Sequence, residues 1–319
     1  MSFPAHRSPG SPPRIGVALG SGGARGWAHV GVLQRLIELQ IPISFIAGTS
    51  IGSIMAAAFA ADRLDVLESV TYQMDSRRIA QLVMEVGFPR TGLLTGKRIQ
   101  HLLQEVIGVT RIEDLRIPYA AVAACLRTGE AVVFTQGSVM DAIRASIAIP
   151  GIFVPALQNG EHLVDGGIIN PLPIDVVEAM GADVVIAVDV NLNASSGHEL
   201  QRNPETAINP AAAAAAAAIL TQIGAPRPVH GAVADAMQRW FRRQTPGLSI
   251  FEVLTRSARI SENQITRGRL KLHPPAVLIQ PAVGSIETLE FHRAIQAIEA
   301  GRVAVDGCAE QLKALVSFQ

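Results

Sequence analysis

The chain has 319 residues, enough for one large α/β domain or two small ones. Its 27 Lys and Arg residues are balanced by 27 Asp and Glu residues, so the overall charge gives no reason to expect a nucleic-acid-binding protein. The two cysteines, Cys125 and Cys308, lie far apart in the sequence, which favours two buried thiols in a reducing compartment over a disulfide.

The N-terminal stretch MSFPAHRSPGSPPR is rich in proline and serine. It has no apolar run of the kind found in a secretory signal, and its composition is typical of a disordered segment. We therefore expect residues 1–13 to form a disordered tail and the protein to be cytoplasmic.

A glycine-rich loop follows the first predicted strand. Residues 15–19 (IGVAL) indicate a buried strand, and apolar residues at helical spacing indicate a helix from Trp27 onward. The loop between them, residues 20–26, differs from a dinucleotide-binding loop because its third glycine comes one position late and no carboxylate ends the next strand. We expect no nicotinamide or flavin cofactor, and the loop's consecutive N–H groups instead suit an oxyanion hole.

Residues 45–61 (FIAGTSIGSIMAAAFAA) carry no charge and admit three interpretations: a membrane span, a core segment, or a turn that holds a reactive serine. The first half is β-branched and aromatic and the second half is rich in alanine, which predicts a strand followed by a helix. The break, Gly48-Thr49-Ser50-Ile51-Gly52, is the G-x-S-x-G pattern of a nucleophile elbow. A glycine- and serine-rich turn without chemistry is the alternative.

A serine nucleophile needs a base, and the eight histidines include none in an obvious catalytic loop. Residues 161–165 predict a short strand that ends at Asp165, before Gly166 and Gly167. Such an aspartate can approach another loop closely, although from the residues alone an ordinary Asp-Gly-Gly turn is the simpler explanation. Residues 118–126 and 131–135 predict paired strands, and residues 139–153 predict a helix that ends at Pro150-Gly151.

The C-terminal third predicts a helical run at 211–223, a helix at 250–272 and a last strand within 276–283. Between residues 225 and 272, nine basic residues stand against three acidic ones. This charge is typical of a solvated helix face. The sharper hypothesis is a peripheral contact with an anionic membrane, on its inner face, through the segment Arg239, Trp240, Phe241, Arg242 and Arg243.

Four motifs together resemble the patatin-like phospholipase family, in its bacterial branch related to neuropathy target esterase. They are GGARG at 22–26, GTSIG at 48–52, ASIAIPGIF at 145–153 and DGGIINPLP at 165–173, in the family's order. The resemblance implies a three-layer α/β/α fold with a mostly parallel central sheet and a nucleophile elbow. It covers residues 14–190 as the catalytic core, and we expect residues 191–319 to form a mainly helical extension packed on the same domain.

The resemblance also implies a Ser-Asp dyad, with Ser50 as the nucleophile and Asp165 as the base that accepts its proton. The implied oxyanion hole is formed by the N–H groups of Gly22, Gly23 and Ala24, and the implied supports of the elbow and loops are Gly48, Gly52, Arg25, Gly166 and Gly167. Ser21 departs from the family's loop, which often has glycine there, but it keeps a backbone N–H. Arg25 either stabilises the loop or meets a phosphate, and the first role is the simpler.

The activity that the resemblance implies is hydrolysis of acyl esters by a phospholipase A or lysophospholipase mechanism through an acyl-enzyme, with an acyl lipid or lysophospholipid as substrate and no metal. The alternative is a lipid-binding regulatory or scaffold protein that keeps the fold and has little turnover. The sequence does not determine the head group, the chain length, the sn position or the oligomeric state.

Overall fold

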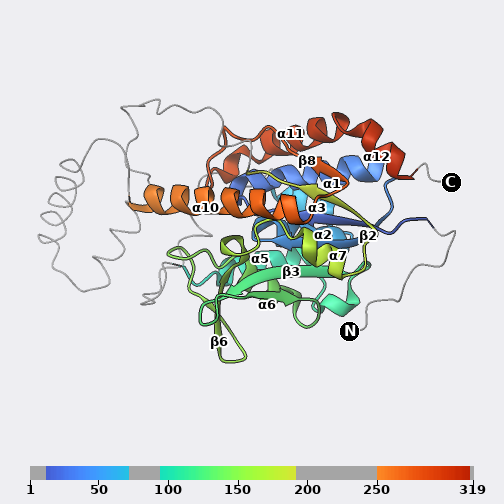
Figure 1. Ribbon diagram of the computed structural model, residues 1–319. Helices are drawn as coiled ribbons and strands as arrows, with labels where there is room; N and C mark the ends of the chain where they lie inside the picture. Colours follow the sequence, from blue (N-terminus) through green and yellow to red (C-terminus); the bar gives the residue numbers. More distant parts are fainter. Residues whose placement is uncertain (1–11, 72–93, 192–249, 317–319) are drawn as a thin grey trace, which may run out of the picture.

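An eight-stranded sheet organises the part of the chain that the computed structural model describes, residues 12–71, 94–191 and 250–316 (Figure 1). The strands run in the order β5-β6-β3-β2-β1-β7-β8, and β4 also pairs with β3. The strand bounds are β1 (Ile15–Leu19), β2 (Ile43–Thr49), β3 (Tyr119–Cys125), β4 (Ala131–Phe134), β5 (Ala156–Gln158), β6 (Glu161–Asp165), β7 (Val184–Val188) and β8 (Val277–Ile279).

The helices of the described residues connect these strands and cover them. They are α1 (Ala28–Glu38), α2 (Ile51–Ala60), α3 (Leu64–Thr71), α5 (Lys97–Ile107), α6 (Val139–Ser146), α7 (Ile174–Ala179), α10 (Ile250–Leu272), α11 (Ala294–Asp306) and α12 (Ala309–Val316). Short 3-10 turns are η1 (Gly23–Trp27), η2 (Ile112–Asp114), η3 (Gly166–Ile168) and η5 (Phe291–Arg293).

The centre of the sheet is parallel and one margin is antiparallel. β1 pairs in parallel with β2 and β7, and the parallel set continues to β3 on one side and β8 on the other. β4 and β6 both run antiparallel to β3, and β5 runs antiparallel to β6. The prediction of an α/β fold with a mostly parallel sheet is confirmed.

Apolar side chains cover both faces of the sheet, as expected for parallel strands buried between helices. One core cluster joins the sheet to α1, α2, α5 and α11, and α11 lies along α1 (Figure 1). A second cluster joins the opposite face to α7 and to Leu270 of α10. These three layers are the predicted α/β/α arrangement.

Most predicted elements appear at the expected places. The first strand, the paired strands β3 and β4, and the helix over residues 250–272 agree with the sequence. The helix predicted to end at Pro150 ends earlier, at Ser146, with Ile147 as its C-cap. Pro150 disfavours helical conformation in the residue directly before it, Ile149. The last strand is only Val277–Ile279, since Pro281 cannot donate to a sheet.

The uncharged stretch at residues 45–61 is a core segment. β2 and α2 divide it, and Phe45–Ala58 are buried without a break. No helix among the described residues is long and apolar enough to cross a membrane. The membrane-span interpretation of this stretch is therefore excluded by its own geometry.

Three sequence predictions fall wholly or mostly outside the described residues: the N-terminal tail, of which residues 1–11 are outside, the helical run at 211–223 and the basic segment Arg239–Arg243. They stay predictions. We keep the division into a core at 14–190 and a packed extension at 191–319 as a proposal, which is supported by the pairing of β8 with β7 and by the packing of α11 on α1.

Candidate active site

Ser50 occupies a strained turn between β2 and α2. Its backbone has φ 57° and ψ −127°, in a region that residues with a side chain rarely adopt. A Cβ at Gly48 would lie 2.2 Å from the carbonyl carbon of Gly52, and a Cβ at Gly52 would lie 2.4 Å from the Leu19 carbonyl oxygen. The two glycines therefore let the strand, the helix and β1 meet closely enough to form the elbow.

Buried hydroxyl groups hold the elbow in this conformation. The Ser146 Oγ, from α6, accepts the Ser50 N–H at 2.9 Å and donates to the Val122 carbonyl of β3 at 2.6 Å. The Ser53 hydroxyl donates to the Ser50 carbonyl at 2.6 Å. Both polar groups of the Ser50 backbone are thus satisfied, so the strained turn is tied to two neighbouring elements.

The sheet register brings Asp165 to Ser50. β3 lies between the two strands that end near these residues, with Val122 opposite Thr49 and Ala123 opposite Asp165. The Ser50 Oγ donates to Asp165 Oδ2 at 2.5 Å, and Asp165 Oδ1 accepts the Gly167 N–H at 2.8 Å. The two residues that the sequence analysis paired as nucleophile and base are therefore in direct contact, although β6 is antiparallel to β3.

The pair is almost completely shielded from solvent, with Ser50 5% exposed and Asp165 4% exposed. Burial raises the pKa of Asp165 to about 7, and the carboxylate of Glu262 acts in the same direction. The hydrogen bonds from Ser50 and Gly167 oppose this rise. Asp165 therefore changes protonation state near neutral pH, where a general base is most effective.

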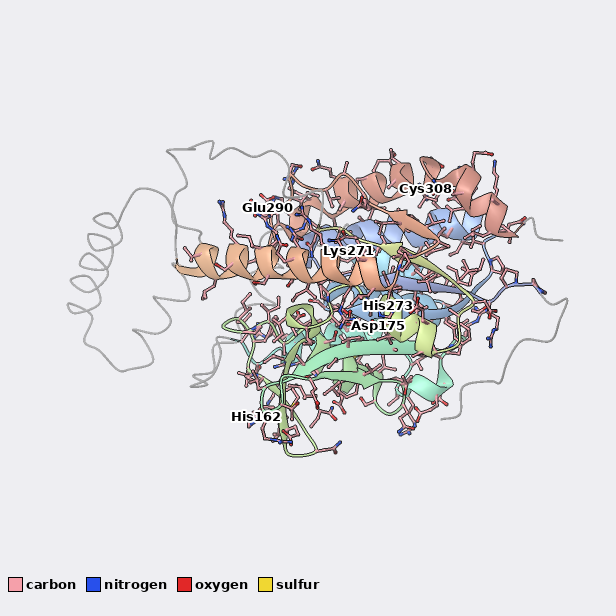
Figure 2. The ribbon with its side chains drawn as sticks, viewed as in Figure 1. His162, Asp175, Lys271, His273, Glu290 and Cys308 are labelled. Carbon is pink, nitrogen blue, oxygen red and sulfur yellow. The ribbon has the colours of Figure 1, made fainter. Side chains whose placement is uncertain are left out.

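Among the described histidines, none hydrogen-bonds to Ser50 or Asp165. His29 is buried with Nε2 2.9 Å from the Gly20 carbonyl, and burial lowers its pKa to about 4, so the neutral ring donates this bond. His162 is exposed on the outer part of the sheet, far from α10 in Figure 2. His273, just after the end of α10, lies 2.7 Å from Glu178.

The backbone N–H groups of the glycine-rich loop differ in whether they already donate a hydrogen bond. The Ala24 N–H donates to the Thr288 carbonyl at 2.9 Å, so it is occupied and does not point to an incoming oxyanion. Within the described residues, the N–H groups of Gly22 and Gly23 donate no hydrogen bond. Of the three N–H groups expected to form the oxyanion hole, those of Gly22 and Gly23 therefore stay available in this conformation, and that of Ala24 does not.

The buried side chain of Arg25 stabilises the glycine-rich loop. It is 1% exposed, and its guanidinium donates to Asn191 Oδ1 at 2.9 Å and to the Ile286 carbonyl at 3.0 Å. Burial lowers its pKa to about 10, and the neighbouring Arg259 contributes to this fall. A side chain enclosed in this way favours the structural role over contact with a substrate phosphate.

Two residues of this network were not among the site residues that the sequence analysis named. Asn191, just after β7, donates to the Ser21 carbonyl at 2.9 Å and to Glu262 Oε2 at 3.1 Å. Glu262 comes from the middle of α10 and also accepts the Ser21 hydroxyl at 2.9 Å. The position of Asn191 at the end of a parallel strand was a usable clue, whereas Glu262 is a glutamate in a long polar helix.

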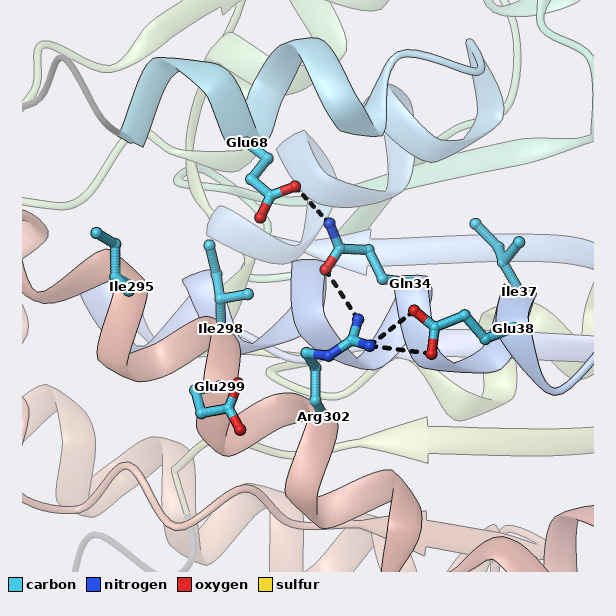
Figure 3. A pocket seen from close by; sticks show the side chains of 8 residues that line it. All are labelled: Gln34, Ile37, Glu38, Glu68, Ile295, Ile298, Glu299 and Arg302. Atoms are coloured by element: carbon cyan, nitrogen blue, oxygen red, sulfur yellow. Dashed lines mark hydrogen bonds and ion pairs between the residues drawn. The ribbon is translucent and has the colours of Figure 1, made fainter.

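A surface hollow of about 520 Å³ lies elsewhere, between α1, α3 and α11 (Figure 3). Its polar side chains are largely paired with one another: Arg302 donates to Glu38 at 2.7 Å, and Gln34 donates to Glu68 at 2.6 Å. Its lining includes neither Ser50 nor Asp165. No group of three or more His, Cys, Asp or Glu side chains in the described part of the chain could hold a metal ion.

Comparison with known proteins agrees with this geometry. The family model described as patatin-like phospholipase matches residues 17–177, half of the chain. An NTE family protein from Mycobacterium tuberculosis is 34% identical over 325 residues, covering 92% of this chain and 90% of that protein.

Two further matches are less complete. Patatin-like phospholipase domain-containing protein 7 from Rattus norvegicus is 36% identical over 181 residues, which is 55% of this chain and 13% of that protein. The crystal structure of VipD from Legionella pneumophila covers 95% of this chain and 67% of its own, with a TM-score of 0.47 and 15% identity. On the family model and the mycobacterial relative, the chain belongs to the patatin-like phospholipase family, in the branch of the NTE proteins.

Proposed function

We propose that this protein is a lipid acyl-ester hydrolase of the phospholipase A or lysophospholipase type, with Ser50 as the nucleophile and Asp165 as the base. The observation that carries the proposal is the 2.5 Å hydrogen bond from Ser50 Oγ, in its strained turn, to a buried carboxylate. Membership of the patatin-like phospholipase family supports a lipid ester as substrate.

In the first step, Ser50 Oγ attacks the ester carbonyl carbon while its proton passes to Asp165 Oδ2. An aspartate at its ordinary pKa is too weak a base to assist much, and the rise to about 7 makes the transfer less unfavourable. The C–O bond to the alcohol then breaks, and the alcohol leaves with the proton held by Asp165. An acyl-enzyme on Ser50 remains.

In the second step, a water molecule gives a proton to Asp165 and attacks the acyl carbon. The bond to Ser50 Oγ breaks, Ser50 recovers the proton, and the fatty acid is released. Each tetrahedral intermediate carries negative charge on the former carbonyl oxygen. We assign its stabilisation to the N–H groups of Gly22 and Gly23, helped by the positive N-terminal end of α2, which begins at Ile51.

The proposal is tested by labelling with a fluorophosphonate probe and by fatty-acid release from lysophosphatidylcholine and phosphatidylcholine micelles. Wild-type protein is expected to be labelled on Ser50 and to release fatty acid. Ser50→Ala is expected to abolish both, and Asp165→Asn to lower turnover by about three orders of magnitude or more, as the loss of one member of a catalytic unit does.

His162→Ala is the matched control, because His162 lies three residues from Asp165 in the same strand but is exposed. Its turnover is expected to stay close to that of the wild type. Equal losses in Asp165→Asn and His162→Ala, with both variants folded, would contradict the dyad. Labelling of Ser50 without turnover on any acyl ester would favour a lipid-binding scaffold instead.

A further inference from the structure

Glu262 connects α10 to the loop that precedes the proposed oxyanion donors. Its Oε2 accepts the Ser21 hydroxyl at 2.9 Å and the Asn191 side-chain amide at 3.1 Å. Ser21 is followed directly by Gly22 and Gly23, and Asn191 also donates to the Ser21 carbonyl. Glu262 Oε2 therefore holds the side chain of Ser21 directly and the backbone of Ser21 through Asn191.

The other oxygen of Glu262 faces the catalytic aspartate across Gly167. A Cβ at Gly167 would lie 2.7 Å from Glu262 Oε1 and 3.1 Å from Asp165 Oδ1, so these two oxygens are within about 6 Å of each other. Only a glycine leaves room for this approach. A like charge at this distance, in a largely buried setting, favours the protonated form of its neighbour.

The groups around Glu262 act on its charge in opposite directions. Burial raises the pKa of Glu262, whereas the hydrogen bonds from Ser21 and Asn191 and the charge of Arg25 in η1 favour the carboxylate, and the charge of Asp189 after β7 adds to the net rise. Asp165 faces Glu262 and Ser50, and none of the causes that shift its pKa is a cation. The two carboxyl groups thus have different environments at one edge of the sheet.

We propose that Glu262 is a positioning residue for the hydrolysis proposed above: it anchors the glycine loop through Ser21 and Asn191, and its second carboxylate oxygen faces the carboxyl group of Asp165 across Gly167. This inference rests on the proposed function. It assigns two separable effects to one side chain. The anchor depends on hydrogen bonds, and the effect on Asp165 depends on charge.

The test uses the pH profile of kcat/KM on a soluble short-chain ester, which reports the base of the free enzyme. Glu262→Gln removes the charge and nearly keeps the shape, so the acidic limb of the profile is expected to move down by about 0.5 to 2 pH units and kcat to fall at neutral pH. Ser21→Ala removes a hydrogen bond and keeps the charge, so it is expected to lower kcat several-fold and to move the limb less than half as far. Glu262→Asp, which restores the charge, is expected to return the limb towards its wild-type position.

Glu310→Gln is the matched control, because it removes one negative charge from an exposed side chain on α12. Its profile is expected to match the wild type. The inference would be overturned if Glu262→Gln and Glu310→Gln had the same acidic limb in the pH profile of kcat/KM and the same kcat. A Ser21→Ala variant with unchanged kcat would also overturn it.

A second measurement separates this inference from the proposed function. The difference in unfolding free energy between wild type and Asp165→Asn, followed against pH, reports the titration of Asp165 without any substrate. In the Glu262→Gln background, the pH at which Asp165 titrates in this difference is expected to fall by the same amount as the acidic limb of the activity profile. If wild-type protein hydrolyses no ester, the proposed function fails, whereas an unmoved transition overturns the action of Glu262 on Asp165.

Discussion

Replacing the base by its neutral isostere is expected to stabilise the fold above neutral pH while removing activity. Asp165 is 4% exposed, and burial with the charge of Glu262 raises its pKa from 3.8 to about 7. The folded protein thus binds the proton of Asp165 more tightly than the unfolded chain does. This stabilising contribution is complete below the unfolded pKa and is lost as the pH rises through the folded pKa.

The size of the effect follows from the pKa difference. A shift of about 3 units, at 1.36 kcal/mol for each unit, corresponds to about 4 kcal/mol over the whole titration. Between pH 4.5 and pH 8, most of that change takes place, about 3 kcal/mol. The asparagine of the Asp165→Asn variant does not titrate, so the stability of this variant relative to wild type is expected to increase by this amount across the range.

Urea denaturation at pH 4.5, 6 and 8, followed by the fluorescence of the buried Trp27, measures this difference. Carboxylates distant from residue 165 titrate alike in both proteins and cancel. Glu262, which faces residue 165, is the exception, and comparing the same pair of proteins in the Glu262→Gln background removes its titration. A constant offset between the two proteins is harmless, because only the pH dependence carries the information. A difference that does not change between pH 6 and 8 would show an Asp165 with an ordinary pKa and would refute the account of the base.

Three further predictions concern other parts of the chain. Ser146→Ala leaves the Ser50 N–H without its acceptor, so unfolding experiments are expected to give a loss of about 1–3 kcal/mol, with slower fluorophosphonate labelling; unchanged values would remove Ser146 from the support of the elbow. Gly268→Ala, in α10 with nothing within 4 Å of the added Cβ, is expected to raise the unfolding free energy by about 1 kcal/mol, and a decrease would contradict the helix propensity argument. Changing the three arginines of residues 239–243 to glutamate is expected to reduce co-sedimentation with anionic vesicles at low salt, since each arginine contributes about 1 kcal/mol at such a surface. Hydrolysis of vesicle lipids is expected to fall as well, whereas hydrolysis of a soluble ester is expected to stay unchanged. Equal effects on both substrates would refute the membrane contact.

The parts of the site that depend on local sequence were predictable. The elbow is encoded within five residues, because the strand, the helix and the glycines at 48 and 52 are all required in the same short segment. Asp165 was less accessible from the residues alone, since an Asp-Gly-Gly turn is common and β6 reaches the site antiparallel to β3. The family's motif order supplied what local patterns did not.

The rest of the candidate site depends on contacts between segments that are distant in the sequence. Glu262 and Ser21 are separated by 241 positions, and nothing in the helical pattern of residues 250–272 distinguishes this glutamate from a solvated one. The engagement of the Ala24 N–H likewise depends on a carbonyl at Thr288. Such contacts are set by how α10 and the segment after β8 pack against the sheet edge, which periodicity and propensity do not specify.

Arg25 acts on the charge of the partly buried Glu262, which lies near the buried Asp165. Two isolated acids in this position would share a proton at neutral pH, because neither charge would be compensated. The buried guanidinium offsets the charge on Glu262, and the donors Ser21 and Asn191 add to that offset. Among the described residues, the donors to the Asp165 carboxylate are the Ser50 hydroxyl and the Gly167 N–H. The two acids therefore differ in their surroundings: the pKa of each is raised, and the charge of Glu262 adds to the rise at Asp165, the acid in contact with Ser50. We therefore expect Arg25 to support the proposed hydrolysis without touching the substrate, because it favours the charged form of Glu262 beside Asp165.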